Sequence, residues 1–265
     1  MTAATATTPA PPTQPPGTLH VPDLLGLAAL YRPDLTLVVW DRAPDPQLAA
    51  FAADVLARTP LQHELEVDAE GLDTFAALPP SLQDHPAADT FAADVRHLAR
   101  AFADLTAASR LGIRLVRLTD AMCPRFHTDV VGVRLLTTYH GAGTEWLAEA
   151  DVDRRFLGHR ANGRDDAESG LLRPGAVVHR LPAFAVALCK GEAWPGNEQR
   201  GFVHRSPASP SPRVLLSIDV LAQDDTDDTD DAPASATFEP VTFEPVRLPP
   251  LHLGAPLGTR RGGRR

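Results

Sequence analysis

The sequence predicts an α+β protein in which an N-terminal helical part packs on a C-terminal part made of antiparallel strands. Three observations support this fold class. Apolar residues recur at helical spacing in two segments before residue 110. Short, β-branched segments follow after residue 111. Loops that contain glycine or proline separate these segments, rather than long helices, which favours a sandwich or barrel over a βαβ fold.

The two ends of the chain differ in composition from the middle. Residues 1–18 are mostly Ala, Thr and Pro, and residues 222–265 form a low-complexity tail with an acidic segment. Segments with few large apolar residues have little surface to bury, so the N-terminal tail is expected to be disordered. We therefore expect one domain over 19–221, with a helical part over about 19–110 and a β-rich part over about 111–221.

Within the helical part, a strand is expected first, over 35–42, because LTLVVWDR is short, apolar and β-branched. A helix is expected over 45–58, with Asp45 as its N-cap. A longer helix follows over 87–110. Both helices carry one apolar stripe, which predicts core packing. The stripes are Leu48, Phe51, Ala52, Val55 and Leu56 in the first helix, and Phe91, Val95, Leu98, Phe102 and Leu105 in the second.

The β-rich part contains four segments that are expected to be strands. Each is short and rich in β-branched residues, and each is followed by a loop. They cover residues 112–120, 130–140, 183–190 and 213–220.

Charge and composition exclude several classes of partner. The formal net charge of −9 and the pI near 5.5 argue against a nucleic-acid-binding surface. No apolar segment approaches the roughly 20 residues that span a bilayer, and the N-terminal segment lacks the features of a secretory signal. Two cysteines are too few for a disulfide scaffold and fit a reducing compartment. We expect a cytoplasmic protein with no nucleic-acid or membrane partner.

The segment CPRFHTDVVGVRLLTTYHGAGTEWL contains the residues best suited to chemistry. Side chains two apart on a strand project to the same face, so His127 and Asp129 are expected to point together. His204 follows 77 residues later, just before the strand that begins at Arg213. Two histidines and one carboxylate on one face leave metal positions open, as in non-haem Fe(II) oxygenases. We predict a metal site formed by His127, Asp129 and His204.

Arg213 follows His204 by nine positions. This arrangement resembles the Fe(II)/2-oxoglutarate-dependent oxygenase superfamily, whose pattern is HxD, a distal His and then Arg or Lys. RLLTTY and GAGTEW also look like the strand, tyrosine and glycine turn that follow HxD in prolyl-hydroxylase-like members. The resemblance implies a double-stranded β-helix (jelly-roll-like) barrel, with Fe(II) and 2-oxoglutarate as cofactors.

The same resemblance implies three residues that bind 2-oxoglutarate. Arg213 would pair with its distal carboxylate, which a planar guanidinium matches bidentately. Tyr139 would hydrogen-bond the co-substrate, and Ser217 would assist. The substrate, a small molecule or a protein, is unknown and is expected near Trp146 and Trp194.

Residues from about 20 to 220 are also similar to a bacterial family known as domain of unknown function 1826. CPRFHTD, GTEWL, KGEAWPGN and VHRSP carry this similarity. The family implies no established activity, but the occurrence of its members beside zinc-homeostasis proteins implies a link to a metal.

Other interpretations of the same residues stay open. Cys123 and His127 form C-x3-H, and Cys189 and His204 would complete a tetrahedral zinc site, since thiolates favour zinc. The alternative function is therefore a zinc-binding protein of metal homeostasis without turnover. A third interpretation is an interaction module without metal, in which the histidines bond to carbonyls and Asp129 pairs with an arginine such as Arg134.

Overall fold

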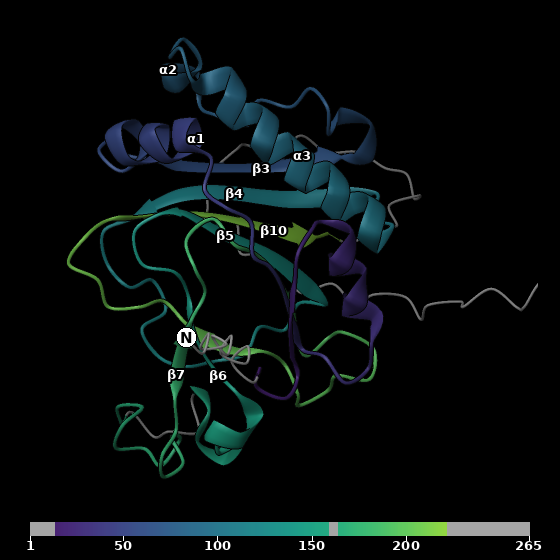
Figure 1. Cartoon of the computed structure of the whole chain (residues 1–265), viewed down its shortest axis with the longest axis vertical. Helices are drawn as coiled ribbons and strands as arrows, with labels where there is room; N and C mark the ends of the chain where they lie inside the picture. The colour runs from purple at the N-terminus through teal and green to yellow at the C-terminus, as the bar shows by residue number, and fades with distance from the viewer. Residues whose placement is uncertain (1–13, 159–163, 222–265) are drawn as a thin grey trace, which may run out of the picture.

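The computed structural model describes residues 14–158 and 164–221, and it is a mixed α/β structure made mostly of sheet (Figure 1). The larger sheet has seven strands, in the spatial order β1-β2-β8-β5-β10-β4-β3. In chain order these are β1 (Thr18–Val21), β2 (Leu37–Trp40), β3 (Gln62–Asp68), β4 (Arg110–Leu118), β5 (Val133–His140), β8 (Val186–Lys190) and β10 (Arg213–Val220). The smaller sheet has the order β7-β6-β9, with β6 (Glu145–Leu147), β7 (Val178–Arg180) and β9 (Val203–Arg205).

Helices cover one face of the larger sheet (Figure 1). They are α1 (Pro46–Phe51), α2 (Pro80–Gln83) and α3 (Ala88–Thr106), with a π-helical turn at Ala52–Leu56 and 3-10 turns at Leu25–Tyr31, Ala69–Gly71, Glu149–Asp151 and Arg154–Phe156. The carboxylate of Asp45 accepts hydrogen bonds from the amides of Gln47 and Leu48, which is the expected N-cap. In the described part of the chain, no helix is both long and apolar enough to cross a membrane.

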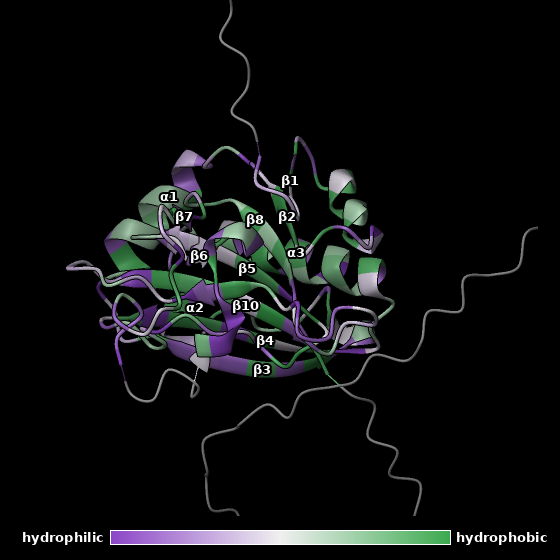
Figure 2. Cartoon of the chain, turned by 90° about the horizontal axis from the view of Figure 1, so that it is seen from below, coloured by the Kyte–Doolittle hydropathy of each residue, from purple (hydrophilic) through white to green (hydrophobic). Residues whose placement is uncertain are grey.

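The main core lies between α3 and the larger sheet. The expected stripe of α3 is buried there, with Phe91, Val95 and Leu98 fully inaccessible. The helix ends where Ala107 adopts the left-handed conformation, with φ of 53°. In Figure 2 the central strands are coloured mainly as hydrophobic, whereas the edge strand β3 carries more hydrophilic residues. This pattern follows from the sheet itself, since the central strands are covered on both faces.

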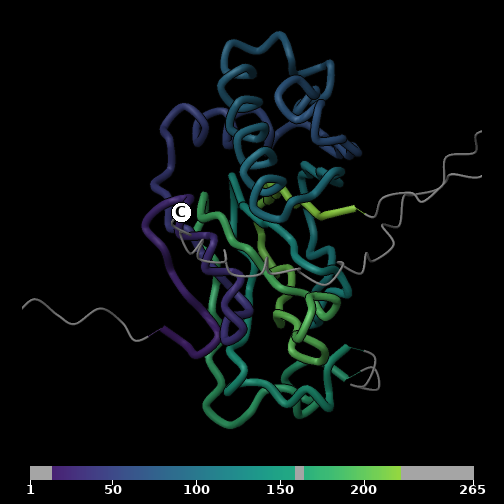
Figure 3. The backbone as a smooth tube through the Cα atoms, turned by 90° about the vertical axis from the view of Figure 1, so that its right-hand side faces the viewer, coloured from purple at the N-terminus to yellow at the C-terminus, as the bar shows by residue number. Residues whose placement is uncertain are grey.

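A second core lies between the two sheets and positions the candidate site. It joins residues of the larger sheet, such as Leu136 and Leu215, to Trp146 and Phe202 from the region of the smaller sheet. From β4 onward the chain passes back and forth between the sheets: β5, β8 and β10 lie in the larger sheet, and β6, β7 and β9 lie in the smaller one. The helices α2 and α3 and the region of β6 therefore lie at opposite ends of the molecule (Figures 1 and 3).

The five strands expected from the sequence are present, with ends shifted by up to three residues. Five further strands were not expected. Three of them, β6, β7 and β9, have three residues each and are too short for a periodic pattern. The strand β3 is mostly polar, and β1 has only four residues.

Two expected boundaries need correction. Residues 19–110 do not form a helical part, because they contribute β1, β2 and β3 to the larger sheet. The N-terminal tail does not extend to residue 18, because Thr18 is buried at the start of β1 and pairs with Leu37 in parallel. The expected tails over 1–13 and 222–265 lie outside the described residues.

Candidate metal centre

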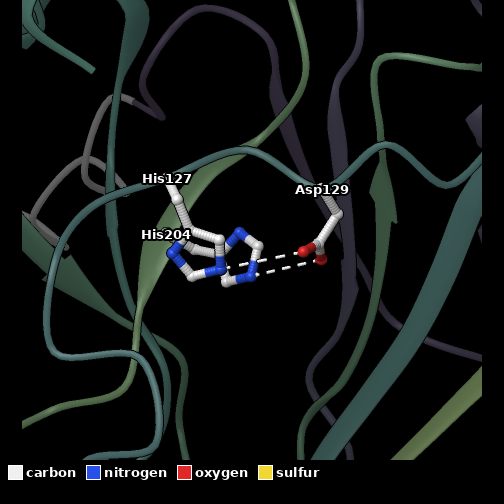
Figure 4. A group of neighbouring side chains, drawn as sticks. All are labelled: His127, Asp129 and His204. Carbon is white, nitrogen blue, oxygen red and sulfur yellow. Dashed lines mark ion pairs between the residues drawn. The ribbon is translucent and has the colours of Figure 1, made fainter. Parts of the chain in front are cut away.

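The side chains of His127, Asp129 and His204 converge in one cluster (Figure 4). Asp129 Oδ1 lies 3.7 Å from His127 Nε2, and Asp129 Oδ2 lies 3.4 Å from His204 Nε2. The two imidazole centroids are 4.5 Å apart. Two donor atoms bound to one ion at about 2.1 Å are roughly 3.0–3.4 Å apart, so these spacings are close to those of three ligands around one metal.

The backbone holds the two histidines side by side. His127 and His204 form an antiparallel β-bridge in which each amide donates to the other's carbonyl at 3.0 Å. Directly opposed residues of an antiparallel pair project to the same face, so the bridge aligns both imidazoles. His127 makes this single bridge outside any regular strand, and Asp129 follows in a loop. The three residues therefore meet as expected, although the expected strand begins only at Val133.

Both imidazole rings are oriented through the nitrogen that faces away from Asp129. His127 Nδ1 lies 2.9 Å from the carbonyl of Arg125, and His204 Nδ1 lies 3.1 Å from the carbonyl of Phe202. A carbonyl can only accept, so each Nδ1 carries the proton and each Nε2 keeps its lone pair. Burial lowers the pKa of His204 to about 4, which leaves the ring neutral near pH 7. Metal-binding histidines need this tautomer and this charge state.

The backbone of Asp129 is held by the turn that follows β8. The amide of Glu192 donates to the Asp129 carbonyl at 2.9 Å. A Cβ on Gly191 would lie 2.0 Å from the carbonyl oxygen of Val131 and 2.8 Å from that of Asp129. Only glycine fits there, so Gly191 is a positioning residue that the sequence analysis did not single out, although it lies in the segment KGEAWPGN.

The carboxylate of Asp129 is oriented by Arg134. Arg134 Nη1 donates to Asp129 Oδ2 at 2.6 Å, while Nε and Nη2 donate to both oxygens of Asp219 at 2.7 and 2.8 Å. Burial alone raises the pKa of Asp129, but the neighbouring His204 and Arg134 outweigh it and lower that pKa below its usual value. Asp129 is therefore an ionised carboxylate, and its Oδ2 lies near both Arg134 and His204.

Arg213 is a buried cation without a full set of partners. It is 2% exposed, and Nη2 donates to Thr144 Oγ1 at 3.2 Å. Its Nε and Nη1 are buried and have no hydrogen-bond partner among the residues that the structure describes. Burial lowers the pKa of Arg213 to about 10, with a further contribution from Arg180. Buried unsatisfied donors are rare in folded proteins, so this guanidinium is suited to an anionic ligand.

Thr144 brings Arg213 toward the triad. Thr144 lies two residues before Trp146, whose backbone pairs with His204. Glycines permit this approach: a Cβ on Gly141 would lie 2.4 Å from the carbonyl oxygen of Pro212, and one on Gly143 would lie 1.9 Å from that of Leu181. The motif GAGT thus packs the end of the smaller sheet directly against the start of β10.

Tyr139 does not lie at the triad, and its expected contact with a co-substrate is wrong. Its hydroxyl donates to Asp94 Oδ2 at 2.5 Å, and Arg42 forms a bidentate ion pair with the same carboxylate at 2.6 and 3.0 Å. The ring packs against Phe91 and Phe184 beneath the helices. Tyr139 therefore projects from the face of β5 that is opposite to Arg134.

The predictions for Ser217, Trp146 and Trp194 have different outcomes. Ser217 lies on β10 beside Leu136 and Arg114, and its hydroxyl forms no hydrogen bond with any described residue, so its assisting role stays a prediction. Trp146 packs near Phe202, at 5.9 Å between centroids, and Phe202 in turn stacks on His204. Trp194 instead belongs to the core on the helical side, and its expected place near the substrate stays a prediction.

The cysteines do not join the metal ligands. Within residues 14–158 and 164–221, the group of side chains that could hold a metal contains His127, Asp129 and His204 but neither Cys123 nor Cys189. Cys123 is exposed, and burial raises the pKa of the Cys189 thiol far above its usual value. The tetrahedral zinc site expected from these two cysteines and the two histidines is not assembled.

The chain was compared with protein-family models, curated proteins and solved structures. A family model described as protein of unknown function (DUF1826) matches residues 22–219. None of the curated proteins matches the chain.

Similar solved structures include three proteins of low sequence identity. A dioxygenase for auxin oxidation in rice is 17% identical, with 78% of this chain and 83% of that chain covered and a TM-score of 0.45. Neurospora crassa T7H in complex with alpha-KG is 11% identical, with 77% and 84% covered and a TM-score of 0.42. A Pseudomonas putida prolyl-4-hydroxylase is 12% identical, with 74% and 96% covered and a TM-score of 0.40.

Proposed function

We propose that this chain, which belongs to the DUF1826 family of proteins of unknown function, is a non-haem Fe(II)/2-oxoglutarate-dependent oxygenase that hydroxylates a substrate. Two observations in the described part of the chain carry the proposal. The side chains of His127, Asp129 and His204 converge, and Arg213, on the strand that follows the second histidine, has two buried nitrogens without hydrogen-bond partners there. A metal triad and an unpaired buried guanidinium are what a site for Fe(II) and a dicarboxylate requires.

The donor set of the triad fits Fe(II). Two imidazole nitrogens and one carboxylate oxygen form the facial arrangement that leaves further positions open for other ligands. The Nδ1 hydrogen bonds of His127 and His204 to backbone carbonyls orient both rings and favour metal binding through Nε2. Arg134 would hold Asp129 so that one carboxylate oxygen faces the metal. When bound, Fe(II) and 2-oxoglutarate supply the oxidative chemistry, and the protein contributes orientation and exclusion of water.

Arg213 and Thr144 are proposed to bind the distal carboxylate of 2-oxoglutarate. An unpaired buried charge is strongly unfavourable, and an anion that completes its hydrogen bonds offsets this cost. The Thr144 hydroxyl, already 3.2 Å from Arg213 Nη2, is the second polar group at this place. It takes the role that the family resemblance gave to Tyr139, and Ser217 keeps its proposed assisting role.

The order of the strands supports a double-stranded β-helix. In that fold, strands of one chain alternate between two facing antiparallel sheets, and the ligand site lies between them. Here β4, β5, β8 and β10 are neighbours in the larger sheet. On the other side, the segment at His127 pairs with β9, which forms the smaller sheet with β6 and β7. The triad then lies at the mouth of the barrel, with Arg213 on its last strand.

Release of succinate tests this function. The full chain, purified without oxygen and supplied with Fe(II), 2-oxoglutarate and O2, is expected to form succinate, because such enzymes turn over 2-oxoglutarate slowly even without their substrate. Asp129→Ala should abolish this release, and Cys123→Ser should not, since Cys123 is exposed and outside the triad. Tight zinc that depends on Cys123 but not on Asp129, with no succinate, would instead support the zinc-binding alternative without turnover.

A further inference from the structure

A cavity of about 300 Å³ lies beside the triad, with His127 in its wall. This volume is at the lower end of the range for small-molecule sites. Thr128 and Glu192 contribute polar atoms to the wall, and Val130 and Leu157 contribute apolar surface. The cavity is therefore amphipathic and adjoins one proposed metal ligand, which is where a substrate would need to lie.

Glu192 gives the cavity a negative charge. Its Oε1 accepts a hydrogen bond from Thr128 Oγ1 at 2.7 Å. Its second oxygen, Oε2, accepts no hydrogen bond and forms no ion pair with any residue that the structure describes. Arg154 also lines the cavity, but Glu149 neutralises it through contacts of 2.7–3.0 Å, and the carbonyl of Gly201 takes a further hydrogen bond. The charge left to meet a ligand is that of Glu192.

Glu192 can accept hydrogen bonds from a cationic group in the cavity. Its Oε1 keeps a lone pair besides the one that Thr128 uses. A compact ammonium can bind through Oε2 alone, and a guanidinium can bind to both oxygens. Val130, which is 57% exposed, and Leu157 offer apolar contact for an aliphatic stem next to that charge.

We infer that the cavity beside His127 binds a substrate that carries a cation, such as an ammonium group, on an aliphatic stem; Glu192 recognises the cation, and the stem packs on Val130 and Leu157. This inference rests on the proposed function for the statement that the occupant is a substrate. Glu192 does not bind the metal; it selects and orients the molecule beside it. Its charge is opposite to that of Arg213, so the anionic co-substrate and the cationic substrate would be sorted to different places.

Calorimetric titration of the full chain with n-pentylamine tests this inference. Glu192→Gln keeps the shape of the side chain and an acceptor for Thr128, but removes the charge. A hydrogen bond to a charged group contributes about 1.5–3 kcal/mol, so pentylamine should bind at least tenfold more weakly to this variant. Glu198→Gln is the matched control, because Glu198 is exposed in the same loop between β8 and β9 and does not line the cavity. n-Pentanol, with the same stem, should bind weakly and should be unaffected by Glu192→Gln. Valerate, whose carboxylate is repelled by Glu192, should bind more weakly than pentanol to the wild type and should gain affinity in Glu192→Gln.

Equal binding of pentylamine to the wild type and to Glu192→Gln would overturn the inference, as would no binding at millimolar concentrations or equally tight binding of pentanol. A lysine with blocked α-amino and carboxyl groups, titrated in parallel, distinguishes a peptide substrate from a free amine. Metal content and succinate release of each variant keep the two proposals separate. Glu192-dependent amine binding without any metal would contradict the oxygenase function alone, whereas succinate release without amine binding would contradict the substrate class alone.

Discussion

The backbones of His127 and His204 exchange two hydrogen bonds of 3.0 Å, which join His127, outside any strand, to His204 in β9. This bridge fixes the relative position of two residues that are far apart in the sequence. Because the bridge consists of backbone atoms, it is formed without a metal. The two imidazoles are therefore preorganised for a metal.

Gly191→Ala should disrupt the metal site by displacing the backbone next to Asp129. The new Cβ would lie 2.0 Å from the Val131 carbonyl oxygen, so the segment that contains Asp129 must move. We expect metal affinity to fall at least tenfold, because carboxylate geometry is lost, and the protein to become less stable by roughly 1–3 kcal/mol. Equilibrium dialysis and urea unfolding measure the two effects. Gly71→Ala is the control, since its Cβ would meet only Val67 at 3.4 Å; equal effects of both variants would contradict this prediction.

Arg134→Met should destabilise the fold as well as the site. It leaves Asp219, which is 6% exposed, without its bidentate partner. Breaking a buried ion pair costs about 3–5 kcal/mol, because the remaining charge stays buried. Arg134→Met combined with Asp219→Asn should recover part of the unfolding free energy, since the uncompensated charge is gone. Urea unfolding of the single and double variants gives the comparison, and additive losses would argue against a coupled pair.

Arg213→Met should weaken 2-oxoglutarate binding without weakening metal binding. Loss of a charge-assisted pair raises the Kd about tenfold or more. The free energy of unfolding should not decrease, because the variant removes a buried cation whose Nε and Nη1 have no hydrogen-bond partner in 14–158 and 164–221. Titration of the metal-loaded protein with 2-oxoglutarate gives the Kd. If the variant binds 2-oxoglutarate normally, or unfolds more easily, Arg213 serves the fold rather than the co-substrate.

Lys190 predicts a pH dependence of stability. Burial lowers the pKa of this lysine to about 8, against roughly 10.4 in an unfolded chain. Between these values the unfolded chain binds a proton that the folded chain does not, so the free energy of unfolding rises with pH in this window. Below about pH 8 both states are protonated and this contribution is constant. In Lys190→Met the rise between pH 8 and 10.4 should be smaller than in the wild type, as measured by urea unfolding; identical pH profiles would contradict it.

The residues of the triad were predictable, but the orientation of Tyr139 was not. HxD, a later histidine and a following arginine are informative because few other arrangements use those chemical groups at those spacings. The face to which Tyr139 projects depends on the phase of β5, in which most residues are buried. A strand buried on both faces has no polar alternation to reveal that phase. The register of β5 also shifts against β10 between Val214 and Leu215, which no local pattern indicates.

The residues that support the triad depend on contacts between distant segments. Gly191 is needed only because the turn after β8 packs against the Asp129 loop, and Thr144 contributes because β6 pairs with β9. The sequence contains these residues in recognisable segments, but their partners arise from the two-sheet arrangement. Three-residue strands such as β6 are formed by such pairing rather than by their own propensity.

A crystal structure of the full chain with Co(II) in place of Fe(II) shows, through the anomalous signal at the cobalt edge, whether the three side chains hold a metal. We predict one strong peak within about 2.2 Å of the Nε2 atoms of His127 and His204 and of one oxygen of Asp129. We also predict that His204→Ala removes the peak. A peak that persists in that variant, or one centred on the sulfur of Cys123, would contradict this prediction.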